Sequence, residues 1–134
     1  MWHNSSLRAK ASLRSAGLGP RRLPLPAPEQ RAILRRIALT RHIPRTITSR
    51  SRLEAELTGA HRRGWSHEHR EFTDATACCG AAILDHTGQP VAAISAAGPA
   101  DRMERALDRI APIVASTAEA ISRRLGYAQP PSVR

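Results

Sequence analysis

Residues Cys78–Tyr127 read CCGAAILDHTGQPVAAISAAGPADRMERALDRIAPIVASTAEAISRRLGY and place two short apolar segments directly before one long amphipathic segment. Residues 77–84 and 90–96 are typical of strands, and residues 85–88 between them carry Asp and Gly where a hairpin turn needs them. Side chains alternate along a strand, so the first strand would have two apolar faces. One face is formed by Cys78, Ala82 and Leu84 and the other by Cys79, Ala81 and Ile83. We therefore predict an antiparallel hairpin that is buried on both faces.

A long helix is predicted to follow Gly98-Pro99. Apolar residues recur there at spacings of three and four, namely at Met103, Leu107, Ile110, Val114, Ala118, Ile121 and Leu125. This spacing forms one continuous stripe along a helix from residue 101 to residue 125, and Gly126 is a suitable stop. Pro112 lies inside the stripe, so we expect it to kink the helix or divide it into two segments.

The residues before the hairpin predict two further helices. Pro28 suits the first position of a helix that continues to about residue 39. Ser51 and Glu54 form a capping-box pattern at the start of a second helix over residues 51–64. Its inner face would carry Leu53, Leu57 and Ala60, and Gly64 would close it. Residues 65–76 are polar and show no period, so they predict a loop.

Charge and composition separate the N-terminal third from the rest. The net charge is +10, with eleven basic residues and one acid in residues 1–50 and ten of each in residues 51–134. The basic third could contact nucleic acid without sequence readout. Adjacent Cys78 and Cys79 form no disulfide framework and fit a reducing cytoplasm, and no apolar run is long enough to span a membrane. The first 28 residues hold no acid, a composition shared with organelle transit peptides, although we favour a diverged bacterial N-terminus.

Patterns typical of enzymes are weak in this sequence. Cys78 and His86 do not form a recognisable nucleophile–base pair, because nothing orients them, and there is no phosphate loop or nucleotide-binding glycine pattern. His67 and His69, with Glu68 and the cysteines, have side-chain types that could bind zinc, but their spacing matches no strong metal motif. We therefore predict that the chain is not an enzyme and has neither a cofactor nor a metal.

Several short sequence motifs, in a fixed order, resemble those of one protein family. They are Pro44–Thr48, Leu53–Trp65, Asp85–Gly88, Val91–Ser95, Gly98-Pro99 and Ile121–Tyr127. Together they are similar to the C-terminal, effector-binding part of the IclR (isocitrate lyase regulator) type of bacterial transcription factor. The resemblance covers about residues 28–127. It implies an α+β fold: a partial GAF-like or profilin-like domain, with an antiparallel sheet flanked by helices that include a long C-terminal one.

The resemblance also implies a domain organisation and a function. Residues 1–27 would be an irregular basic segment, residues 28–127 a partial effector-binding domain and residues 128–134 a disordered tail. The domain would sense a small organic or aromatic acid in the cytoplasm, as a homo-oligomer (dimer or tetramer), in regulation of DNA-templated transcription. DNA would be bound only by a winged helix-turn-helix domain that is separate or lost, so the piece is expected to be truncated. The alternatives are a nonfunctional remnant and nonspecific nucleic-acid binding through the basic third.

Positions that line the pocket in this family can be carried over one at a time. The pocket cysteine corresponds to Cys78, and the acidic loop position ten residues earlier corresponds to Glu68, where the family more often has Asp. The first serine of the family's Ser-x-Ser-Gly corresponds to Ser95, whereas Ala97 replaces the second and loses its hydroxyl. The resemblance therefore implies that Glu68, Cys78 and Ser95 face the effector.

A glycine-rich turn completes the pocket in the family. Gly17 and Leu18 correspond to it, but Pro20-Arg21-Arg22 replaces the helix start that follows it there. Backbone N–H groups in such a turn can hold a carboxylate. Gly17 and Leu18 are therefore included among the predicted ligand-binding residues.

Overall fold

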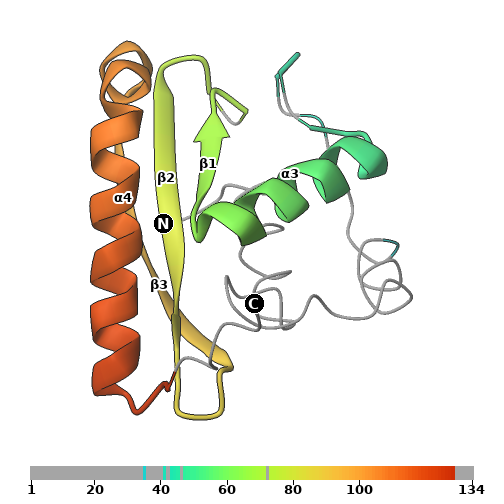
Figure 1. Ribbon diagram of the computed structural model, residues 1–134. Helices are drawn as coiled ribbons and strands as arrows, with labels where there is room; N and C mark the ends of the chain where they lie inside the picture. The colour runs from blue at the N-terminus through green and yellow to red at the C-terminus, as the bar shows by residue number, and fades with distance from the viewer. Residues whose placement is uncertain (1–34, 36–40, 42, 46, 72, 129–134) are drawn as a thin grey trace.

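The computed structural model describes residues 35, 41, 43–45, 47–71 and 73–128 (Figure 1). Along the chain they form helix α3 (Arg50–Arg63), strands β1 (Ser66–His69), β2 (Thr76–Leu84) and β3 (Pro90–Pro99), and helix α4 (Ala100–Arg124). The predictions for residues 1–27, for the tail after residue 128 and for the helix from residue 28, apart from helical Arg35, lie outside the described residues.

The three strands form an antiparallel sheet in the order β1-β2-β3, with β2 at its centre. Helix α4 lies along one face of this sheet, and α3 contacts β1 on the other side (Figure 1). This arrangement confirms the predicted α+β fold with an antiparallel sheet and a long C-terminal helix. Among the described residues, no helix is long and apolar enough to cross a membrane.

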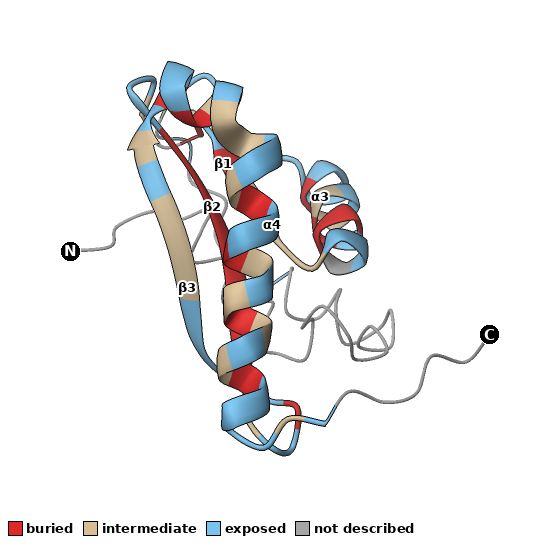
Figure 2. Ribbon diagram, turned by 60° about the vertical axis from the view of Figure 1, so that its left-hand side comes forward, coloured by how far each residue is buried: buried red, intermediate tan, exposed pale blue. Residues whose placement is uncertain are grey.

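The core lies between α4 and alternate residues of β2. On the strand side it is built from Ala77, Cys79, Ala81 and Ile83, and on the helix side from Ala100, Met103, Ala111, Val114 and Ala118. Small side chains on β2 let the helix backbone approach the sheet closely. The buried residues of α4 therefore form the narrow stripe that faces β2 in Figure 2.

Burial on both faces is confirmed for β2 but wrong for β3. Every residue of β2 after Thr76 is buried, whereas β3 is exposed or half-buried throughout, and Val91 keeps 57% of its surface accessible. The difference follows from position. Strand β2 has a strand on each side and α4 on one face, whereas β3 is the last strand in the order β1-β2-β3.

Helix α4 is a single continuous helix, so of the two expected effects of Pro112, a kink or a division, the division into two segments is wrong. A proline removes one N–H donor and leaves the carbonyl four residues earlier, that of Asp108, without its usual partner. Both residues are exposed, so water can satisfy that carbonyl and the helix continues. The helix ends at Arg124, and Gly126 follows as the predicted stop with φ of 85°, while the Tyr127 N–H donates to the Ser122 carbonyl at 3.0 Å.

The cap of helix α3 lies two residues before Ser51, the residue at which the capping box was predicted. Ser49 caps it: the Ser49 side chain accepts a hydrogen bond from the Arg52 N–H at 3.4 Å, and Ser51 bonds the Ser49 hydroxyl at 2.9 Å. The predicted end is confirmed, because Gly64 adopts φ of 79° and donates to the Ala60 carbonyl. The predicted inner face is also confirmed, since Leu53, Leu57 and Ala60 are buried.

Residues 66–69 form β1, although a loop was predicted over residues 65–76. This strand is polar, and it buries its polar residues: Ser66 and Glu68 face inward. An apolar alternation is therefore absent, and pairing with β2 determines the strand. The loop is confirmed only after His69.

The predicted hairpin turn is confirmed at residues 85–88. The Asp85 carboxylate accepts hydrogen bonds from the Thr87 hydroxyl at 2.6 Å, the Thr87 N–H at 2.8 Å and the Gln89 N–H at 3.0 Å. These donors, the Thr87 hydroxyl first, hold the pKa of Asp85 below its usual value. The turn fixes the register of β2 against β3 and hence which residues share a face.

Candidate functional site

Three of the five predicted ligand-binding residues lie together on one face of the sheet. Glu68 pairs with Cys78, Cys78 pairs with Ala97, and Ser95 pairs with Gly80, two residues along β2 from Cys78 and therefore on the same face. Paired residues of antiparallel strands share a face. Cys79 and its neighbours face α4, so Glu68, Cys78 and Ser95 face the other way. Gly17 and Leu18 lie outside the described residues.

Glu68 and Cys78 touch through their side chains. The Cys78 thiol donates to Glu68 Oε2 at 3.9 Å, and Glu68 Oε1 accepts a hydrogen bond from the Glu71 N–H. Both residues are buried, with 2% of Glu68 and 5% of Cys78 accessible. A buried carboxylate is costly unless donors surround it. Here the chain itself supplies donors to both carboxylate oxygens.

Two further residues of this face were missed by the sequence analysis. Ser66 is buried and pairs with Gly80, which in turn pairs with Ser95, so these three form a row beside Glu68 and Cys78. A Cβ on Gly80 would lie 3.5 Å from the Cβ of Ser95, so glycine leaves open the space next to the Ser95 hydroxyl. Recognising β1 as a strand would have revealed this row through its register.

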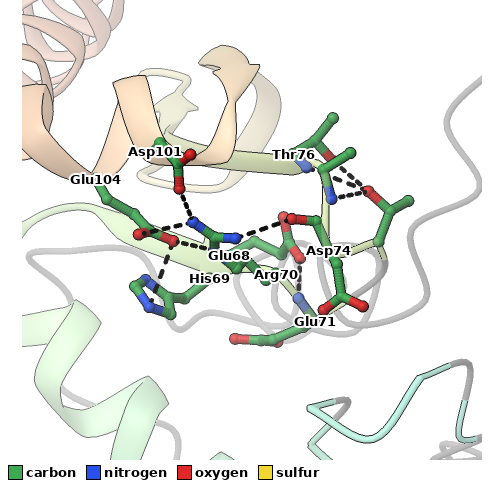
Figure 3. A network of polar contacts seen from close by, with 10 residues as sticks. Glu68, His69, Arg70, Glu71, Asp74, Thr76, Asp101 and Glu104 are labelled. Atoms are coloured by element: carbon green, nitrogen blue, oxygen red, sulfur yellow. Dashed lines mark hydrogen bonds and ion pairs between the residues drawn. The ribbon is translucent and has the colours of Figure 1, made fainter.

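The turn after Glu68 is tied to α4 by Arg70 (Figure 3). Arg70 is the only described non-glycine residue with positive φ, at 53°. Its guanidinium donates to both carboxylate oxygens of Glu104, at 2.6 and 3.2 Å, to Asp101, and to the Asp74 carbonyl at 3.2 Å. These bonds raise the pKa of Arg70 and hold the pKa of Glu104 below its usual value.

The far end of the same turn is held by the backbone. The Thr73 hydroxyl accepts hydrogen bonds from the N–H groups of Ala75 and Thr76, both at 3.2 Å. The Ala100 N–H, at the start of α4, donates to the Ala75 carbonyl at 2.9 Å. Residues 70–75 therefore reach α4 at two points, through a side chain at one end and through the main chain at the other.

The zinc interpretation loses support because its residues lie on two faces. His67 pairs with Cys79 and shares the α4 face, with His69 two residues along the same strand, whereas Glu68 and Cys78 face the opposite way. His69 instead lies 3.5 Å from Glu104 of α4. Within the part of the chain that the structure describes, no three His, Cys, Asp or Glu side chains gather closely enough to hold a metal ion.

Two cavities border this region and differ in size. A cavity of about 10 Å³, room for at most one water molecule, lies on the α4 side of β1 and β2, because its lining combines Glu68 and Cys78 with Met103, Glu104 and Leu107. A wider, open cavity of about 530 Å³ lies between the segment before α3, α3 and β1. Its described lining is polar and of mixed charge: Pro44, Arg45, Ile47, Arg52, Glu56, His67, His69 and Glu71.

Comparison with known families identifies the chain. The family model described as bacterial transcriptional regulator IclR C-terminal matches residues 18–123. The chain belongs to the IclR family. This confirms the resemblance read from the sequence, and the relatives of this IclR-type chain are transcriptional regulators and not enzymes, as predicted.

The HTH-type transcriptional repressor AllR of Klebsiella pneumoniae is 35% identical over 124 residues, which are 90% of this chain and 45% of AllR. The IclR crystal structure from Thermotoga maritima is 31% identical with a TM-score of 0.71, over 85% of this chain and 44% of that one. This chain thus spans about half the length of the relatives it matches.

A more distant structure shares the fold alone. It is the inducer-binding domain of a double mutant of PobR from Acinetobacter, in complex with 3-hydroxybenzoic acid, at 18% identity and a TM-score of 0.67 over 84% of this IclR-type chain and 61% of that one. The fold of this chain is therefore that of IclR-type effector-binding domains.

Proposed function

We propose that this chain is the effector-sensing portion of an IclR-type transcriptional regulator and that it binds a small organic or aromatic acid on the face formed by Glu68, Cys78 and Ser95. The observation that carries the proposal is the strand register, which brings these three side chains from three strands to one face. Gly17 and Leu18 would add backbone N–H groups for the carboxylate of the ligand. The organisation into residues 1–27, 28–127 and 128–134 belongs to the same proposal.

The polar groups of this face favour a hydroxy acid over an oxo acid. An ionised Glu68 carboxylate can only accept hydrogen bonds, whereas the Ser95 hydroxyl and the Cys78 thiol can also donate. A ligand hydroxyl can donate to Glu68, but a keto oxygen cannot and would leave the buried carboxylate facing another acceptor. The carboxylate of the ligand would lie away from Glu68, because like charges repel.

Binding would act on an equilibrium between two arrangements of the domain. Glu68 and Cys78 are buried, with 2% and 5% of their surface accessible, so an acid that contacts both side chains binds an arrangement that is more open than the one described. A ligand with higher affinity for the open arrangement increases its population. In the full regulator this shift would pass through a homo-oligomer in the cytoplasm to a separate DNA-binding domain.

A thermal-shift comparison of matched acids tests the proposal. Lactate against pyruvate, and 4-hydroxybenzoate against benzoate, differ in the hydroxyl group that Glu68 would accept. At a concentration 100 times its Kd, a ligand that binds only the folded chain should raise Tm by on the order of 10 °C. We expect the hydroxy acid of at least one pair to raise Tm more than its partner. If no acid of either pair shifts Tm, this chain is not an acid sensor of these classes.

Replacing Ser95 with valine should weaken binding of the responding acid about fivefold, because one neutral hydrogen bond contributes roughly 1 kcal/mol. Valine replaces the hydroxyl by a methyl group and adds a second one, and because Ser95 is only half-buried the fold should accommodate this addition. Isothermal titration calorimetry measures the affinity. Ser116→Val is the matched control, since Ser116 is exposed on α4 and bonds only within that helix, to the Ile113 carbonyl at 3.0 Å. An unchanged affinity in Ser95→Val would remove Ser95 from the site.

A further inference from the structure

We propose that Arg70 is a positioning residue that couples the Glu68 site to α4, so that a change at the Glu68 carboxylate alters how the first turn of α4 is held. The inference deepens the proposed function and rests on it in one respect, namely that Glu68 faces the ligand. The coupling itself is a property of the chain without a ligand. It can therefore be tested separately.

The backbone of Arg70 shapes the chain beside Glu68. Arg70 lies between Glu68 and Glu71, and the Glu71 N–H donates to the Glu68 carboxylate. For this bond to form, the chain has to reverse direction within three residues, and Arg70 does so with φ of 53°. L residues adopt this left-handed region at a cost, so the conformation persists only when other contacts enforce it. The Glu68 carboxylate is thus positioned through the backbone of Arg70.

Contacts between the Arg70 side chain and α4 enforce this conformation. The Arg70 guanidinium binds Asp101 and Glu104, which lie one turn apart on the same side of α4, and also the Asp74 carbonyl within its own turn (Figure 3). Arg70 has only 21% of its side chain accessible, and Glu104 has 26%. Both carboxylates share one planar cation, a geometry that fixes direction as well as distance.

The two ends of the turn between β1 and β2 respond differently to a ligand at Glu68. The Ala100 N–H donates to the Ala75 carbonyl at 2.9 Å, a bond that does not involve Arg70 and gives the turn a second attachment to α4. Arg70 holds the end next to Glu68, where His69 also lies 3.5 Å from Glu104. A ligand that occupies Glu68 competes with the Glu71 N–H and relaxes this end. Asp101 and Glu104 then lose a well-placed partner, and the first turn of α4 is held less firmly.

A ligand-free experiment tests the coupling. Four versions of the chain are compared by amide hydrogen exchange: the unchanged chain, Glu68→Gln, Arg70→Gln and the double variant. Glu68→Gln weakens the acceptor for the Glu71 N–H and imitates its loss to a ligand. With Arg70 present, we expect exchange at residues 104–106 of α4 to rise about 3- to 30-fold, the range of measured couplings between sites. Without Arg70, Glu68→Gln should add no further change.

One control variant and one substitute variant separate coupling from a general loss of stability. Arg123→Gln removes a pair of similar chemistry at the other end of α4, between Arg123 and Glu119 at 3.0 Å, and the response to Glu68→Gln should survive it. If Arg70→Gln does not fold by circular dichroism, the double variant Asp101→Asn/Glu104→Gln replaces it, because it keeps Arg70 and removes its charged partners.

The proposal is overturned if Glu68→Gln changes exchange in α4 equally with and without Arg70, or in neither background. If hydrogen exchange shows no coupling but an acid still raises Tm, the role of Arg70 is rejected and the proposed function is retained. Intact coupling without any thermal shift rejects the proposed ligand class and leaves the coupling standing.

Discussion

Replacing Leu53 with alanine is expected to lower the free energy of unfolding by about 2–5 kcal/mol, the range for removing a buried leucine side chain. Leu53 is 1% accessible and is the largest fully buried side chain among the described residues. It lies on the inner face of α3, the helix that contacts β1. Truncation removes apolar contacts and leaves a cavity, because the residues of α3 and β1 around it can move in only in part.

This loss is large against a total stability of about 5–15 kcal/mol for a domain of ordinary size. Chemical denaturation followed by circular dichroism measures it. The matched control is Leu125→Ala, the same truncation at a residue that is 46% accessible, which should change stability by less than about 1 kcal/mol. Equal losses in the two variants would mean that α3 does not pack as described.

Replacing Ser122 with valine is expected to lower the free energy of unfolding by about 1–3 kcal/mol, the cost of leaving a buried polar group without a partner. The Ser122 hydroxyl accepts a hydrogen bond from the Leu84 N–H at 2.9 Å and donates to the Ala118 carbonyl at 2.7 Å. Strand β1 pairs with β2 only over residues 77–80. Beyond residue 80, β1 offers the β2 backbone no acceptor, and the Ser122 hydroxyl accepts the hydrogen bond of the Leu84 N–H instead.

Valine offers no acceptor, so the Leu84 N–H would remain buried and unsatisfied, and its additional methyl group adds to the loss at this buried position. Ser116→Val on the exposed side of α4 serves as the control and should stay within about 0.5 kcal/mol. Thermal unfolding of both variants, with hydrogen exchange at Leu84, measures the effect. Slow exchange at Leu84 in Ser122→Val would show that another group satisfies this N–H.

Apolar periodicity predicted the elements whose burial follows a simple pattern. Helix α4 and the β2–β3 hairpin were identified because their side chains repeat at helical or strand spacing. Strand β1 was missed because it buries Ser66 and Glu68, and a polar strand has no apolar alternation to detect. The start of α3 was misplaced because Ser49 and Ser51 both satisfy capping chemistry, and the local sequence does not distinguish them.

The candidate site divides in the same way. Glu68, Cys78 and Ser95 came from the family resemblance, and the register of the sheet explains how residues this far apart in sequence share one face. The role of Arg70 could not be predicted, because its partners Asp101 and Glu104 lie 31 and 34 residues away. A single arginine in a polar loop carries no local signal. Only the packing of α4 against the sheet brings the three residues together.

The side chains of adjacent Cys78 and Cys79 point to opposite faces of the sheet. The two thiols therefore report on two different openings of the structure. Cys79 lies against α4, and its burial raises the pKa of its thiol, so an alkylating reagent reaches it only when α4 lifts from the sheet. Cys78 lies beside Glu68 and becomes reactive when that side opens. Mass spectrometry of peptides modified at one thiol or the other would thus distinguish opening of the ligand face from detachment of the helix, without any engineered label.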